Sequence, residues 1–181
     1  METYTATKAL IENPHYIAQR EQSLRDLDIN AIDVPIKEMI RSVRKIPFCF
    51  TLQCCYGHFL YAGQEKRHNI KPLPISDSIT AIEYRIAYVA VCIENSRLGK
   101  ELLEHLEQIP AIDPEYIQFG CAEWFWKRQV NSYALQVEPS RFQTKDTCLV
   151  EYNEAIHLEK VKRQYFIQLN QLIQEALSGL T

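Results

Sequence analysis

A short segment near residue 50 carries side chains whose types could do chemistry. Gln53 could read a base edge or a carboxylate, and Cys55 becomes a nucleophilic thiolate where a cation or a helix N-terminus lowers its pKa. His58 could donate to a phosphate or carboxylate, or accept a proton near neutral pH. Gly57 lies between them and permits a sharp turn or a close approach to a ligand. The ordinary alternative is a plain strand turn with a packed thiol.

The same segment also has the nearest approach to metal-ligand spacing. Cys54, Cys55 and His58 are close in sequence, but zinc sites normally pair their ligands as C-x2-4-C or H-x3-5-H. We therefore expect no metal and keep a small metal-binding protein as an open alternative. Most of the six cysteines lie in or beside apolar runs, which favours packed thiols over disulfides.

Two further clusters combine positive charge with a loop or with aromatic rings. Cations in a loop can hold phosphates, and aromatic rings beside cations can stack on bases. A solvated loop and a core strand are the ordinary alternatives. The predicted substrate- or phosphate-contacting residues are Lys66, Arg67, His68, Trp124, Trp126 and Arg128.

Hydrophobic spacing predicts the helices and strands that position these residues. Helices are expected over 15–27, 34–46, 98–109 and 147–177, with Asp33 as a cap of the second. Strands are expected over 48–52, 59–61, 83–94, 116–126 and 132–137, with a long loop over 62–78. This order predicts one α+β domain over residues 1–181, with residues 1–32 as an N-terminal helical extension. The domain should have a mixed or mostly antiparallel sheet covered by helices, and a long C-terminal helix.

Composition excludes several classes of protein. The chain has 181 residues, 46% hydrophobic and 10% aromatic, with a net charge of −3. These values exclude global disorder and do not indicate a strongly basic nucleic-acid binder. The glycines form neither G-x-G-x-x-G nor a P-loop, so those two nucleotide sites are not expected. No apolar run reaches the length of a membrane span, and the start lacks a signal-peptide pattern, so we expect a cytoplasmic protein without a membrane partner.

The segment from Pro47 to Phe59 resembles the tRNA wybutosine-synthesising protein 3 family. In that family a helix runs through a proline into a strand that reads roughly T-x-S-C-S-G-R-I. Cys55, Gly57 and His58 match the cysteine, glycine and arginine of that motif, while Gln53, Cys54 and Tyr56 replace its serines. The downstream order of strand, helix, strands and long helix is also similar, so the resemblance extends from about residue 36 to 177.

The resemblance implies a ligand- or RNA-binding protein, and the activity of the family is methyl transfer from S-adenosylmethionine to a tricyclic tRNA base. It implies S-adenosylmethionine as cofactor, RNA as partner and a site around Gln53 to Phe59. In that interpretation Gln53, Cys55 and His58 are the catalytic group that orients the substrate. The predicted cofactor-binding residues are Thr51, Tyr56 and Gly57.

A different class of function remains open from the residues alone. The exposed side of the last helix and the aromatic stretch near Trp124 could form a homodimer face in a non-catalytic homo-oligomeric protein.

Overall fold

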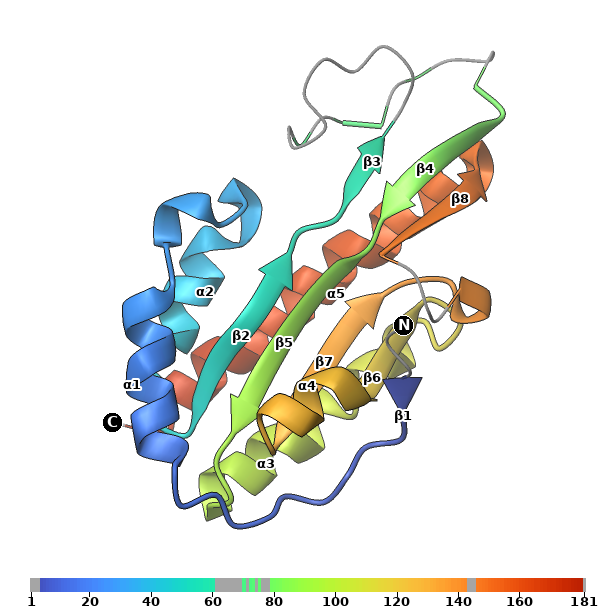
Figure 1. Cartoon of the computed structure of the whole chain (residues 1–181). Helices are drawn as coiled ribbons and strands as arrows, with labels where there is room; N and C mark the ends of the chain where they lie inside the picture. The colour runs from blue at the N-terminus through green and yellow to red at the C-terminus, as the bar shows by residue number, and fades with distance from the viewer. Residues whose placement is uncertain are drawn as a thin grey trace.

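The computed structural model describes residues 4–60, 70, 72–73, 75, 79–142 and 146–180. It is an α+β domain (Figure 1). Its strands are β1 (Tyr4–Thr5), β2 (Cys49–Cys55), β3 (His58–Leu60), β4 (Ala81–Arg85), β5 (Ala87–Ile93), β6 (Ile117–Ala122), β7 (Ser132–Val137) and β8 (Thr147–Glu151). Its α-helices are α1 (Tyr16–Asp26), α2 (Lys37–Val43), α3 (Arg97–Leu106), α4 (Glu123–Arg128) and α5 (Tyr152–Ser178). Short 3-10 turns cover Ile29–Ala31, Val34–Ile36, Ile109–Ile112 and Ser140–Phe142.

The strands form two antiparallel sheets. One has the order β1-β6-β7-β5-β2, and the other has the order β3-β4-β8. The chain passes from the first sheet to the second between β2 and β3, and returns between β4 and β5 (Figure 1). The predicted fold class is confirmed: an α+β domain with antiparallel sheets and a C-terminal helix of 27 residues.

Helices lie on both faces of the five-stranded sheet. Alternate strand residues such as Val89 and Leu135 face the core with α5, whose Tyr165 hydroxyl donates to the Leu135 carbonyl at 3.0 Å. The small residues Ala90 and Ala134 face the other way, against Phe125 of α4. Figure 1 shows α5 behind this sheet and α4 in front of it.

Two sequence predictions about local structure are wrong. Residues 123–128 form helix α4 and not the end of a strand, because only Phe125 of this segment is buried and β6 ends at Ala122. Residues 147–151 form strand β8 and not the first turns of the last helix, because they pair with β4 and bury alternate side chains. The strand predicted over 83–94 is interrupted at Ile86, whose N–H donates to the Asp146 carbonyl at 3.0 Å.

All six cysteines are free thiols, and five of them are buried. Within the described residues no helix is both long and apolar enough to cross a membrane.

Gly57 makes the bend between β2 and β3. Its φ of +83° lies in the left-handed region, which side chains other than glycine rarely adopt. A Cβ built there would lie 2.8 Å from the Cβ of Ala87 and 3.0 Å from its backbone nitrogen. The space beside Gly57 is therefore filled by β5.

We predict that Gly57→Ala lowers the free energy of unfolding by about 1–3 kcal/mol, because it combines backbone strain with a clash against Ala87. Denaturant unfolding measures the change. Gly179→Ala is the matched control, since its nearest neighbours are 3.7 Å away, and it should change stability by less than about 0.5 kcal/mol. Equal stability of the two variants would contradict the strained bend.

Glu138, which follows β7, is a buried carboxyl group. It is 1% exposed, and its Oε2 accepts from Gln136 Nε2 at 2.8 Å. Its Oε1 has no hydrogen-bond partner among the described residues. Burial, followed by the charge of Asp146, raises the pKa of Glu138 from 4.5 to about 7. The folded protein therefore holds a proton here that the unfolded chain has released above pH 4.5.

We predict that Glu138→Gln removes a pH-dependent loss of stability. A raised carboxyl pKa means that stability falls as pH rises from about 4.5 through about 7. The glutamine variant should thus be more stable than the native chain by about 2 kcal/mol at pH 8 and nearly equal at pH 4.5. Thermal unfolding across this range checks the result, and parallel curves for the two proteins would refute it.

Candidate functional site

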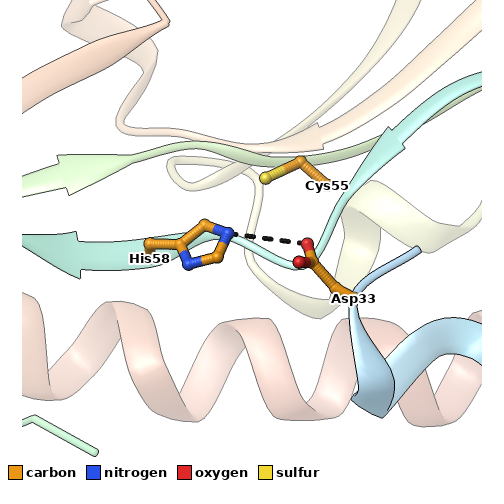
Figure 2. A group of neighbouring side chains, drawn as sticks. All are labelled: Asp33, Cys55 and His58. Atoms are coloured by element: carbon orange, nitrogen blue, oxygen red, sulfur yellow. Dashed lines mark ion pairs between the residues drawn. The ribbon is translucent and has the colours of Figure 1, made fainter. Parts of the chain in front are cut away.

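The bend between β2 and β3 brings together three side chains that could do chemistry. Cys55 ends β2, His58 begins β3, and Asp33 comes from the turn before α2 (Figure 2). His58 Nε2 lies 3.5 Å from Asp33 Oδ2. One donor atom from each of the three residues lies within 4.8 Å of the others.

Backbone groups of the bend fix this arrangement. The Tyr56 N–H donates to Asp33 Oδ2 at 2.8 Å, and the Gly57 N–H donates to Cys55 Sγ at 3.4 Å. Asp33 therefore accepts from the bend as well as from the imidazole. Because Asp33 stands immediately before the 3-10 turn that leads into α2, the same carboxylate ties this helix to the strand bend.

Asp33 and His58 form a charged pair with little exposure of the imidazole. The His58 side chain is 6% exposed and that of Asp33 is 22% exposed. The hydrogen bonds to Asp33 and then to Cys55 raise the pKa of His58 to about 9, against an opposing effect of burial. Burial alone would raise the pKa of Asp33, but the hydrogen bonds from His58 and the Tyr56 N–H outweigh it and lower that pKa. The pair is thus an imidazolium and a carboxylate at neutral pH.

The geometry distinguishes three possible uses of these side chains: a nucleophilic relay, a zinc site and a fixed cation. A nucleophilic relay needs the thiol on one ring nitrogen and the carboxylate on the other. Here the thiol and the carboxylate both lie toward Nε2 (Figure 2), and Nδ1 is buried without a partner among the described residues. A tetrahedral zinc would need the donors about 3.4–3.8 Å apart and would have to displace the Nε2 proton. The arrangement fits best a fixed cation held at a strand bend.

A second buried charge lies beside the bend on α5. Lys162 is 3% exposed, and its Nζ lies 2.7 Å from Glu159 Oε2. The same Nζ lies 4.4 Å from the ring centroid of Tyr56 and 5.1 Å from that of Phe59. Burial lowers the pKa of Lys162, although Glu159 opposes the shift. The two aromatic residues that flank Gly57-His58 are thus held against α5 by a cation.

The sequence interpretation missed two of these residues. It assigned Asp33 only a capping role, and no local spacing connects Asp33 to a strand that begins sixteen residues later. Lys162 belongs to a run of charged residues on the last helix that predicts a solvated face, and this prediction is wrong because Lys162 is buried. A signal was present in this case: Lys162 follows Leu158 by four residues and precedes Phe166 by four, within the buried stripe of α5.

The predicted catalytic and cofactor residues are only partly assembled. Cys55 and His58 lie together, with Tyr56 and Gly57 beside them. Gln53 is exposed and interacts with the Tyr88 hydroxyl at 3.3 Å, while Thr51 is buried and separated from Gln53 by a strand irregularity. The alternative metal set is not assembled either: Cys54 pairs with Val89, points away from Cys55 and lies outside the group of donor atoms.

The predicted nucleic-acid residues on α4 lie apart from the bend, over the five-stranded sheet. Trp124 is 38% exposed, and the Arg128 guanidinium lies 3.9 Å from its ring centroid. Trp126 is half-buried against Tyr133 and carries Lys8 over its ring at 5.0 Å. The predicted phosphate residues Lys66, Arg67 and His68 lie outside the described residues.

The fold and site define an α+β protein with antiparallel sheets and a buried imidazolium–carboxylate pair at a strand bend. Two solved structures are similar to it. The PH1069 protein from Pyrococcus horikoshii is 10% identical, with a TM-score of 0.49 over 90% of this chain and 96% of that one. A hypothetical protein from Aeropyrum pernix is 12% identical, with a TM-score of 0.40 over 80% of this chain and 96% of that one. No protein-family model and no curated protein matches the chain.

We predict that Asp33→Asn returns the pKa of His58 from about 9 toward 6.5, because the carboxylate is the main cause of the shift. Titration of the His58 ring protons by NMR measures this change. Because the pKa of His58 is raised in the folded protein, this residue contributes stability below pH 6.5 that is lost as the pH rises through about 9. Because the pKa of Asp33 is lowered, the contribution of Asp33 to stability is present above pH 3.8. The variant should therefore be most destabilised between about pH 4 and 6.5.

Asp113→Asn is the matched control, because Asp113 forms the other described histidine–aspartate pair, with His157 at 2.8 Å. It should leave the titration of His58 unchanged. An equal change of the His58 titration in both variants would rule out the direct effect of Asp33.

Proposed function

We propose that this protein is an S-adenosylmethionine-dependent RNA methyltransferase of the kind that its sequence resembles, with its site at the β2–β3 bend. The observation that carries the proposal is the charge of His58. The best match to the motif of the wybutosine-synthesising protein 3 family aligns His58 with an arginine. Asp33 and Cys55 raise the pKa of this histidine to about 9, so that the position keeps a positive charge at neutral pH.

The surroundings of His58 support a role in binding rather than in proton transfer. A histidine with a pKa of about 9 remains protonated and is a poor general base at pH 7. A fixed cation is instead suited to a carboxylate or a phosphate. S-adenosylmethionine carries a carboxylate, and RNA carries phosphates, so each component of the proposed reaction has a group that fits.

Methyl transfer makes few demands for acid–base groups. The cofactor supplies an electrophilic methyl group, and alignment of donor and acceptor accounts for much of the rate. Cys55 and His58, held by the bend, would orient the ligands, and the backbone of Tyr56 and Gly57 would line the same position. Gly57 itself serves the turn, because Ala87 fills the space beside it.

The test is calorimetric titration with S-adenosylmethionine and S-adenosylhomocysteine. We expect micromolar binding that His58→Gln weakens about tenfold or more, since the cation is lost. His58→Arg restores the residue of the motif and a permanent charge beside Asp33, and it should retain binding. Both variants change one position only, so that the arginine variant distinguishes loss of charge from loss of packing.

His157→Gln is the matched control, because His157 is half-exposed on α5 and pairs with Asp113 rather than Asp33. It should bind as the native protein does. Absence of binding by both compounds to the folded native protein would overturn the methyltransferase proposal.

A further inference from the structure

Strand register places four polar or reactive side chains in one row across the five-stranded sheet. Cys55 pairs with Tyr88, Tyr88 pairs with Gln136, and Gln136 pairs with Gln118. Directly opposed residues of antiparallel strands share a face, so the four side chains stand on the face that carries α4. We call Cys55, Tyr88, Gln136 and Gln118 the polar row. Its first member belongs to the site at the bend.

The adjacent row on the same face consists of Gln53 and three small residues, and Phe125 of α4 covers its two alanines. Gln53 pairs with Ala90, Ala90 with Ala134, and Ala134 with Gly120. The Tyr88 hydroxyl reaches Gln53 Oε1 at 3.3 Å across the two rows. The polar row and Gln53 therefore lie beside the part of the face that α4 covers.

Glu138 fixes the orientation of two amides in the polar row. Gln136 Nε2 donates to Glu138 Oε2 at 2.8 Å, and Gln118 Nε2 donates to the Glu138 carbonyl at 3.2 Å. Because its Nε2 already donates to the Glu138 carbonyl, the half-buried Gln118 amide presents Oε1 as an acceptor. The Tyr88 hydroxyl and the exposed Gln53 amide add further polar groups to this edge. Glu138 itself is 1% exposed, so it holds these two amides from within the protein.

Helix α4 borders this face with an aromatic ring and a cation. Phe125 packs on Ala90 and Ala134, which anchors the helix beside the polar row. The neighbouring Trp124 is 38% exposed, with the Arg128 guanidinium 3.9 Å from its ring centroid. Exposed tryptophan stacks on a nucleobase of any type, and arginine neutralises phosphate.

We propose that this face binds one nucleotide of an RNA strand, with the polar row at the hydrogen-bonding edge of its base and Trp124 and Arg128 on the adjoining base and phosphate. The proposal rests on the RNA substrate of the proposed function and names where that substrate lies. Oriented amide and phenol groups match the donors and acceptors of a base edge. Cys55, the first member of the polar row, places the bound base next to the bend.

The first test is fluorescence anisotropy with a labelled single-stranded RNA of mixed sequence, without S-adenosylmethionine. Gln118→Leu and Tyr88→Phe keep the size of each side chain and remove its hydrogen bonding. Each should weaken RNA binding about tenfold. Trp124→Ala should weaken it by a similar factor. Gln171→Leu, on the exposed side of α5, is the matched control and should leave binding unchanged.

An abasic strand of the same length separates recognition of a base from attraction of the backbone. The native protein should bind the abasic strand more weakly, and Gln118→Leu should cause no further loss on it. Equal loss on both strands, equal loss in Gln171→Leu, or no RNA binding by the native protein would overturn the proposal.

Calorimetry with S-adenosylmethionine and no RNA distinguishes the two proposals. If Gln118→Leu weakens cofactor binding and spares RNA binding, the face takes the adenine of the cofactor and our assignment to RNA is wrong. If the cofactor fails to bind while RNA binding depends on Gln118 and Tyr88, the methyltransferase proposal fails and the nucleotide site stands.

Discussion

The pairing of Asp33 with His58 is the interaction on which the arrangement of the site depends. It joins the turn before α2 to the point at which the chain leaves one sheet for the other. A buried imidazolium without a counterion would lose its proton, and a buried carboxylate without donors would gain one. Each group keeps its charge because the other is present, and the Tyr56 N–H adds a donor to the carboxylate. Gly57 permits the turn that brings His58 to Asp33.

A second charged pair lies beside the bend. Lys162 and Glu159 on α5 are close together, and the ammonium lies against the rings of Tyr56 and Phe59. Replacing a buried ion pair by apolar residues often leaves stability unchanged or higher, so such pairs are weak evidence for stability alone. Two such pairs beside one bend instead define its position, since a shifted strand would leave charges unpaired.

Local periodicity made much of the fold predictable. The buried stripes of α2, α3 and α5, the turn at Gly57 and the strand of β7 follow from spacing and residue type. The errors lie where local preference is overridden by partners distant in sequence. Aromatic residues favour a strand over 123–126, but of these residues only Phe125 is buried, where it packs against Ala90 and Ala134. Residues 147–151 continue the apolar spacing of the last helix, yet β4 offers them hydrogen bonds along its free edge.

The same distinction explains why only part of the site was predictable. Cys55 and His58 are neighbours in sequence, so motif reasoning could find them together. Asp33 joins them only through the packing of α2 against β2, and the polar row exists only through the register of four strands. That register places Gln136 opposite Tyr88 and Gln118 opposite Gln136, although more than 25 residues separate Tyr88 from either glutamine. Cys55 belongs to both the site at the bend and the polar row. Its thiol lies within the group of Asp33 and His58, and its strand position begins the polar row. The bend and the sheet face are therefore continuous through one residue.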